Sequence, residues 1–467
     1  MATITSAGVG SGLDLESIIQ ATVNAEDLPK MQRFEATKTR YSVQLSGLGA
    51  VKSSLSAFQD IIKKLADPEN FTKRSNTIVQ PASGDVISVA ANSSATPGNF
   101  NIKVNQLAQG SRATTTSAFT APSDVVSASG GKLTIAAGDK SFEVDVAAGA
   151  TLEEVRAAIN ESATNFGVSV NIINTGGATP EAKLVISSNV SGTGNDLTIT
   201  NDTAELDNIS TTAFSGGAGG LSIAATDMAR DAIVEVDGIA VNSATNIFKD
   251  AIQDLTFTAK KVSVGTETAK LTVDFDKTGV EKLIDEFITA FNNAAGTIEY
   301  HTKAGAALYG DSGMRGLKNQ LTNTLSTVVS GAGGFETLFD VGIGLKKDGK
   351  LEKSSLVRSV NAALTSDYAN VGKLFSGENG LAKTFESLLN TQLEAKGSFK
   401  FREESLNKSM RQLEDDKLSH DYRMTQLEAG LRAKYAGLDV LIAQMQSSGS
   451  YITQQLANLP GFTSNKK

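Results

Sequence analysis

The sequence predicts a multidomain α+β protein whose helical ends enclose a β-rich middle. Three observations support this fold class: the chain length, an apolar repeat of seven residues near both ends, and alternating apolar residues between them. The chain has 467 residues, and at about 150 residues per domain we expect roughly three domains. Because β sequence interrupts helical sequence, the outer domains are expected to be discontinuous.

Near the N-terminus, apolar side chains recur every seven residues, which is the spacing of a coiled-coil seam. Asp14 is well placed to cap a helix that contains Leu15, Ile18 and Ile19. The repeat comprises Phe34, Tyr41, Leu48, Leu55 and Ile62, with Val51, Phe58 and Leu65 three residues after its later members. This spacing predicts a long helix with one apolar stripe.

Between about residues 81 and 275, the apolar period changes from 3.6 to 2, as expected for half-buried strands. The alternating sets are Phe100, Ile102 and Val104; Phe142, Val144 and Val146; Val168, Val170 and Ile172; and Leu271, Val273 and Phe275. Asp237-Gly238 predicts a hairpin with a type I′ turn, and Thr151 with Glu154 predicts a capping box on one short helix. The glycine-rich run 214–220 is interpreted as a linker between two β lobes.

Helical patterning returns after residue 276, and a second seven-residue repeat follows near the C-terminus. Its members are Met424, Leu431, Leu438, Met445, Ile452 and Leu459, widened by Leu427, Leu441, Ile442 and Leu456. Each of the two apolar stripes must pack against another surface, and the simplest partner is the other terminal helix or a neighbouring subunit.

Four domains are predicted from these patterns. They are a terminal coiled coil (1–40 and 430–467), an α-rich leg (41–80 and 276–429), an inner β-rich head (81–125 and 226–275) and a distal β-rich head (126–225).

Composition argues against several classes of function. With 43 basic and 51 acidic residues, the formal charge is -8, and there is no basic cluster of the kind that neutralises phosphates. We therefore expect no nucleic-acid partner and no membrane partner. The chain has no cysteine and two histidines, so thiol chemistry and cysteine-based metal sites are excluded, and no metal or cofactor is predicted. The start lacks a signal-peptide pattern and the sequence has no run of about 18 apolar residues, so we expect a soluble protein without a Sec-type signal.

Few residues suggest catalysis. The run 310–313, Gly-Asp-Ser-Gly, resembles a serine-protease turn, but Met314 stands where that motif continues with glycine, so Asp311 or Ser312 is interpreted as a helix cap. Gly8, Gly10 and Gly12 lack the spacing of a dinucleotide loop and are interpreted as a flexible segment.

His420 lies on the apolar interval between Leu413 and Leu427. We interpret it as a partly exposed residue of the C-terminal repeat, although a titrating group at this position could also tune helix pairing.

Several segments together resemble the flagellar hook-associated protein 2 family, which comprises filament-capping proteins. They are GVGSGLDLESII (8–19), PGNFNIKVNQLAQ (97–109), TLEEVRAAIN (151–160), ARDAIVEVDGIAVNSATNIFKDAI (229–252), GLKKDGKLE (344–352) and YAGLDVLIAQMQSSGSYITQQLANL (435–459). The order of the segments is specific to the family, whereas any one of them alone is weak. One departure is Phe291-Asn292, where the family has Tyr-Asn.

The resemblance implies an axial coiled coil of the terminal helices, an α-rich leg and two β-rich head domains. It also implies a secreted protein at the distal tip of the flagellum, exported unfolded by the flagellar type III apparatus, that promotes flagellin polymerisation and prevents flagellin leakage without being an enzyme. The implied partners are further copies in a ring, expected to be a pentamer, flagellin, the hook-filament junction proteins, and a cytoplasmic export chaperone at the C-terminal helices.

The residues expected to make oligomer or filament contacts lie on the two terminal repeats. They are Phe34, Tyr41, Leu48, Leu55, Leu438, Leu441, Ile442, Met445, Ile452 and Leu456. Two alternatives stay open: a tip adhesin that uses the polar β head, and a hook-filament junction protein or flagellin, which share helical termini and a β middle.

Overall fold

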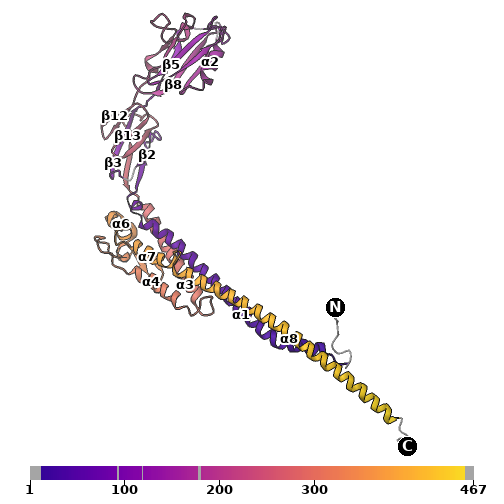
Figure 1. Cartoon of the computed structure of the whole chain (residues 1–467). Helices are drawn as coiled ribbons and strands as arrows, with labels where there is room; N and C mark the ends of the chain where they lie inside the picture. Colours follow the sequence, from indigo (N-terminus) through magenta and orange to yellow (C-terminus); the bar gives the residue numbers. More distant parts are fainter. Residues whose placement is uncertain (1–11, 92–93, 118, 177–179, 458–467) are drawn as a thin grey trace. The chain divides into compact units, whose positions relative to one another are not determined.

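The computed structural model describes residues 12–91, 94–117, 119–176 and 180–457. The chain divides into two compact units, one formed by Met1–Pro68 with Gly279–Lys467 and the other by Glu69–Thr278. The first unit is mainly helical and the second mainly β (Figure 1). The predicted α+β class, with helical ends and an inserted β region, is confirmed.

Two long helices dominate the helical unit: α1 has 52 residues and α8 has 60. The helices of this unit are α1 (Leu15–Ala66), α3 (Lys277–Thr302), α4 (Ser312–Leu325), α5 (Val360–Ser366), α6 (Tyr368–Ser376), α7 (Leu381–Leu393) and α8 (Ser398–Ala457). A short turn, η4 (Leu338–Val341), and a hairpin of β16 (Ile343–Leu345) and β17 (Leu351–Lys353) lie among them. Because α1 runs unbroken through residue 40 and α8 through residue 430, the terminal and leg domains share both helices, and the division between them stays a prediction.

The core of the helical unit is an aromatic cluster around Phe58 of α1. Its ring centroid lies 5.3 Å from that of Phe385 in α7, and 5.9 and 5.8 Å from those of Phe287 and Phe291 in α3. All four side chains are fully buried, each contributing roughly 1.5–3 kcal/mol of burial. Phe291, the departure from the family pattern, keeps an aromatic ring in this cluster.

The β unit contains two separate cores. A five-stranded antiparallel sheet in the order β1-β15-β3-β11-β12 and a three-stranded sheet β13-β14-β2 enclose the first core. A four-stranded sheet β10-β4-β8-β7 and a three-stranded sheet β6-β5-β9, together with α2, enclose the second.

The strands of the first core are β1 (Arg74–Val79), β2 (Ile87–Ala91), β3 (Gly98–Gln106), β11 (Ala232–Val236), β12 (Ile239–Ser243), β13 (Ile247–Ile252), β14 (Leu255–Ala259) and β15 (Ala269–Phe275). Those of the second are β4 (Gly110–Thr115), β5 (Gly131–Ala137), β6 (Lys140–Val146), β7 (Val168–Asn174), β8 (Ala182–Ser191), β9 (Thr198–Asn201) and β10 (Leu221–Ile223), beside α2 (Leu152–Glu161). Short helical turns are η1 (Pro68–Phe71), η2 (Ala204–Ile209) and η3 (Ala225–Asp227).

The local predictions for this unit are confirmed. The four alternating sets lie in β3, β6, β7 and β15. Asp237 and Gly238 have φ values of 47° and 85°, as a type I′ turn between β11 and β12 requires. Thr151 and Glu154 form a reciprocal capping box at the start of α2.

The interpretation of residues 214–220 as a linker between lobes is wrong. A Cβ on Gly219 would lie 2.2 Å from the Ser210 carbonyl oxygen, and one on Gly220 would lie 2.4 Å from Asn208 backbone atoms. The glycines therefore allow a tight loop that leads into β10, which pairs with β4 inside the second core.

The boundaries between the two β cores lie at other residues of the sequence than those predicted. The first core includes Ala108 and the second begins with Ala113, and after Leu221 the chain returns to the first core at Ala232. The predicted boundary at residue 125 therefore falls within the sequence of the second core, and β1 belongs to the β unit rather than to the leg.

We expect the β unit to fold without the helices, because both of its cores are built from residues of Glu69–Thr278. A fragment of residues 69–278 should unfold cooperatively in a thermal melt followed by circular dichroism. A shorter fragment, 81–275, should melt at a lower temperature because it lacks β1, the edge partner of β15. A gradual, non-cooperative melt of the longer fragment would show that the β unit depends on the helical unit.

Candidate assembly site at the end of the helix pair

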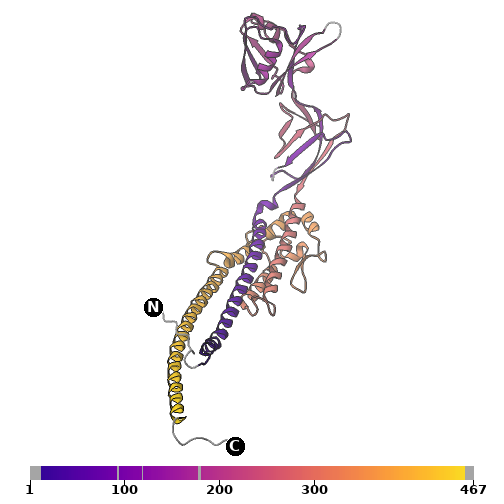
Figure 2. The ribbon, with the colours of Figure 1, turned by 90° about the vertical axis from the view of Figure 1, so that its right-hand side faces the viewer.

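The two long helices of the helical unit pack side by side over much of their length (Figures 1 and 2). The helices are antiparallel, because the start of α8 lies beside the later part of α1 and the later part of α8 lies beside the start of α1. Three ion pairs mark this pairing: Lys52 with Glu403 at 2.9 Å, Glu35 with Lys417 at 3.4 Å, and Glu16 with Arg432 at 2.6 Å.

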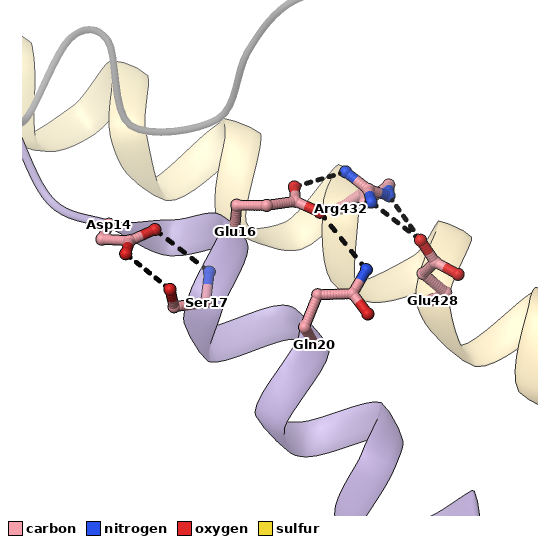
Figure 3. Close-up of polar contacts among 6 residues, drawn as sticks. All are labelled: Asp14, Glu16, Ser17, Gln20, Glu428 and Arg432. Carbon is pink, nitrogen blue, oxygen red and sulfur yellow. Dashed lines mark hydrogen bonds and ion pairs between the residues drawn. The ribbon is translucent and has the colours of Figure 1, made fainter.

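The pairing ends at a cluster of charges around Arg432 (Figure 3). Its two terminal nitrogens donate to the two carboxylate oxygens of Glu16, each at 2.6 Å, and the same guanidinium donates to Glu428. The hydrogen bonds from Arg432 and then from Gln20 lower the pKa of Glu16 below its usual range, and the two carboxylates raise the pKa of Arg432. These groups are exposed, so we regard the cluster as a marker of helix register rather than a large source of stability.

The first turn of α1 is capped as predicted. Asp14 accepts hydrogen bonds from the backbone N–H of Ser17 at 3.1 Å and from its hydroxyl at 2.5 Å. Both bonds, the hydroxyl one first, lower the pKa of the Asp14 carboxyl. The cap satisfies a backbone donor that has no partner inside the helix, and so helps to define where α1 begins. Gly8 and Gly10 lie outside the described residues.

Beyond Arg432, α8 continues for about 25 residues, or roughly 37 Å at 1.5 Å per residue, past the start of α1 (Figures 1 and 2). Residues 435–457 contain one charged side chain, Asp439. We define the C-terminal stripe as the six predicted contact residues on this segment: Leu438, Leu441, Ile442, Met445, Ile452 and Leu456. Ile442 is half-buried and the other five are exposed, from 43% for Leu438 to 67% for Met445.

The predicted contact residues on the N-terminal repeat have a different environment. Phe34, Leu48 and Leu55 are buried inside the helical unit, and Tyr41 is half-buried. The physical reason is that α7 and α8 both pack on α1 and cover its apolar stripe. These residues hold the subunit together, which leaves the C-terminal stripe as the candidate surface for assembly.

The interpretation of His420 as a partly exposed residue is also wrong. Its side chain is 3% exposed and its Nε2 lies 2.9 Å from a carboxylate oxygen of Asp27 on α1. The seven-residue spacing placed it on the correct face of α8, but only the paired structure reveals its partners.

The Gly-Asp-Ser-Gly run forms the start of α4 and not a nucleophile turn. Asp311 is the N-cap, accepting from the Met314 N–H at 3.1 Å, and it also accepts from Arg402 of α8 at 2.7 Å. Burial tends to raise the pKa of Asp311, but the hydrogen bonds from Arg402 and Met314 outweigh that effect, so its pKa lies below the usual range. Leu317 on the inner face of α4 is buried.

Two properties of the described residues bear on function. Among residues 12–91, 94–117, 119–176 and 180–457, no group of three or more side chains is arranged to hold a metal ion. Within the same ranges, no helix is both long enough and apolar enough to cross a membrane.

Fold and site together define a structural α+β protein in which paired terminal helices carry an inserted β region. Family models agree: the flagellar hook-associated protein 2 N-terminus model matches residues 11–111, the C-terminus model matches residues 229–447, and the flagellin hook IN motif matches residues 132–190.

Relatives match nearly the whole chain. The flagellar hook-associated protein 2 of Aeromonas caviae is 38% identical over 463 residues, which cover 96% of this chain and 97% of that protein. The corresponding protein of Escherichia coli K12 is 31% identical, covering 98% and 99%.

Among solved structures, the crystal structure of the flagellar cap protein FliD D1-D2-D3 domains from Escherichia coli aligns with a TM-score of 0.60 and 30% identity, covering 77% of this chain and 99% of that one. The chain belongs to the flagellar hook-associated protein 2 family, whose members are structural cap proteins and not enzymes.

We expect Asp311 and Ser312 to differ sharply in their effect on stability. Asp311→Ala should lower the free energy of unfolding by about 1 kcal/mol or more, since it removes a cap and the partner of Arg402, whereas Ser312→Ala should change it by less than about 0.5 kcal/mol. Urea denaturation at pH 7 measures both variants.

The Asp311 effect should depend on pH. Because folding lowers the pKa of this carboxyl, its contribution is present above the unfolded pKa and is lost as pH falls through the folded value. The difference in free energy of unfolding between Asp311→Ala and the unchanged protein should therefore shrink below about pH 4.

A motility defect in a stable Ser312→Ala protein would contradict the purely structural role of this turn.

Proposed function

We propose that this chain caps the distal end of the bacterial flagellar filament, where it promotes the polymerisation of exported flagellin and prevents its leakage. The observation that carries the proposal is the alignment with the E. coli flagellar cap protein, which extends over 99% of that structure at 30% identity. The near full-length relative from A. caviae supports the same role. The site of action is then the flagellar tip, outside the cell.

The C-terminal stripe is proposed as the surface through which copies assemble into a ring, expected to have five members. Its five exposed apolar side chains lie on one helical segment with a single charge. An exposed apolar surface of this kind is a typical protein-contact site because binding removes it from water. A neighbouring copy then buries the C-terminal stripe, which α1 of the same chain does not reach.

The same stripe needs a cover before export, and we propose that a cytoplasmic chaperone supplies it. An apolar stripe left open at high concentration promotes aggregation. Covering by the chaperone and covering by neighbouring copies are mutually exclusive, since both use Leu438, Met445 and the residues around them. Release of the chaperone then precedes ring formation.

Capping as proposed is steric and conformational, and it requires no reacting side chain. Flagellin that leaves the export channel is held at the filament end long enough to fold into place. Hook-filament junction proteins are the expected contacts before the first flagellin adds. Binding energy and order of assembly, not bond chemistry, then determine the rate.

We expect a deletion of the gene for this chain to leave hooks without long filaments. Flagellin should accumulate in the medium as unpolymerised protein, because nothing retains it at the tip. Electron microscopy of cells and immunoblots of culture supernatants measure the two effects, and restoring the unchanged gene is the control. Filaments of normal length on the deletion strain would contradict the proposed function.

We expect the triple variant Leu438→Ala, Met445→Ala and Ile452→Ala to stay folded but to lose ring formation. These side chains are 43%, 67% and 57% exposed, so truncating them should change the free energy of unfolding of the isolated subunit by at most about 0.5 kcal/mol each. Size-exclusion chromatography with light scattering measures the oligomeric state, and a pull-down measures chaperone binding, which should weaken as well.

A matched control for the triple variant truncates exposed apolar side chains elsewhere in the helical unit. Leu356 and Val357, between β17 and α5, are 96% and 72% exposed, so Leu356→Ala with Val357→Ala removes similar surface without touching α8. This control should assemble normally. Intact rings from the triple variant would show that copies meet through another surface.

A further inference from the structure

One buried polar group in the helix pair has no part in the function proposed above. His420 is among the four buried residues of α8, with Phe399, Met424 and Asp439. On α1 it faces Phe34, whose ring centroid lies 5.8 Å from that of the imidazole. Phe34 is the one buried residue of α1 between Ile19 and Gly47, so the histidine occupies the centre of a narrow interface.

Both ring nitrogens of His420 are hydrogen-bonded, and the partners define the tautomer. The Arg423 guanidinium lies 3.1 Å from Nδ1 and has only donors, so Nδ1 accepts. Nε2 then carries the hydrogen and donates to the Asp27 carboxylate at 2.9 Å. The imidazole thus links a carboxylate on α1 to a guanidinium on α8, and both of its ring nitrogens have a partner.

Around His420, the apolar residues alone do not specify how this part of α8 is aligned along α1, whereas the start of α8 is held by the buried Phe399. Leu413 and Leu427 lie seven residues on either side of His420 and are half-buried. A shift of α8 by seven residues would therefore keep a leucine opposite Phe34. The exposed ion pairs of Glu35 with Lys417 and of Glu16 with Arg432 would break, but such pairs contribute little.

The same shift is costly for His420. It leaves a leucine facing Asp27 and takes the Nε2–H away from its acceptor inside the interface, and a buried donor without a partner is strongly unfavourable. A single polar residue in an otherwise apolar helix seam is known to select one register in this way.

We propose that His420 is the positioning residue that selects the register of α8 on α1, through its donor–acceptor link between Asp27 and Arg423. A shift of seven residues moves α8 by about 10 Å along α1, so this link also determines how far the C-terminal stripe extends past Leu15. The consequence for assembly rests on the proposed function, whereas the register is a property of one chain.

Spin labels can report the register directly, because the chain has no cysteine and two introduced cysteines are labelled selectively. Asn24 and Ser448 are exposed, on α1 and on the free part of α8. With Asp27 opposite His420, the two labels should lie about 37 Å apart, and a shift of seven residues should change this by about 10 Å. Double electron–electron resonance on the full chain with Asn24→Cys and Ser448→Cys, diluted with unlabelled protein, measures distances within one molecule.

We expect a single distance in the unchanged background and a second population, displaced by about 10 Å, in His420→Leu. Leucine keeps the interface apolar and removes the need for Asp27, so the helices should stay paired. His420→Gln should restore the single distance, because the amide can donate to Asp27 and accept from Arg423. Met424→Leu, an apolar replacement one turn away, is the matched control and should also give one distance.

Asp27→Leu tests the link from the α1 side and covers the case in which His420→Leu does not fold, as judged by circular dichroism. It should produce the same second population. A single distance equal to that of the unchanged protein, in a folded His420→Leu or in a folded Asp27→Leu, overturns the proposal. Because oligomers are not measured, this result is independent of whether the C-terminal stripe forms a ring.

Discussion

The antiparallel packing of α1 on α8 is the constraint on which the helical unit depends. Neither helix can bury its apolar stripe alone, since a single helix in water has no second surface to pack against. The 52 residues of α1 and the 60 of α8 come from opposite ends of the chain, so the unit closes only after the residues between them have been made. The β unit, Glu69–Thr278, is tolerated as an insertion because it has cores of its own.

The interface is not uniform along its length. Around Phe58, α1 packs against α3 and α7, and the aromatic rings of the three helices are fully buried together. Further toward the start of α1 only two helices remain, and few side chains are buried between them, among them Ile19, Phe34 and Met424. Where apolar burial is small, polar contacts decide alignment, which explains why charged and imidazole groups bridge the pair there.

The sequence was sufficient for local structure because periodicity and capping depend on near neighbours. The strand sets, the Asp237-Gly238 turn and the Thr151 cap all follow from residues within one element. The sequence was insufficient where a contact between separate segments determines the structure. Residues 214–220 have the composition of a linker, and only their closeness to Ser210 shows that they form a tight loop. Likewise, equal spacing made Leu48 and Met445 look alike, although Leu48 is buried inside the helical unit and Met445 is 67% exposed. The loss of charge after Lys434 was a usable signal of that difference.

The exposed length of α8 has an energetic consequence for assembly. Five side chains of the C-terminal stripe are about half exposed, so covering them fully contributes roughly 4–8 kcal/mol at 1.5–3 kcal/mol per complete burial. Association costs about 4–15 kcal/mol in lost freedom, so one such contact is close to balanced and an isolated pair of copies is weak. A closed ring changes this balance, because the last contact forms within an assembly already held together. Closed symmetry also gives every copy the same two neighbours, which is why a marginal stripe suits the ring that we propose.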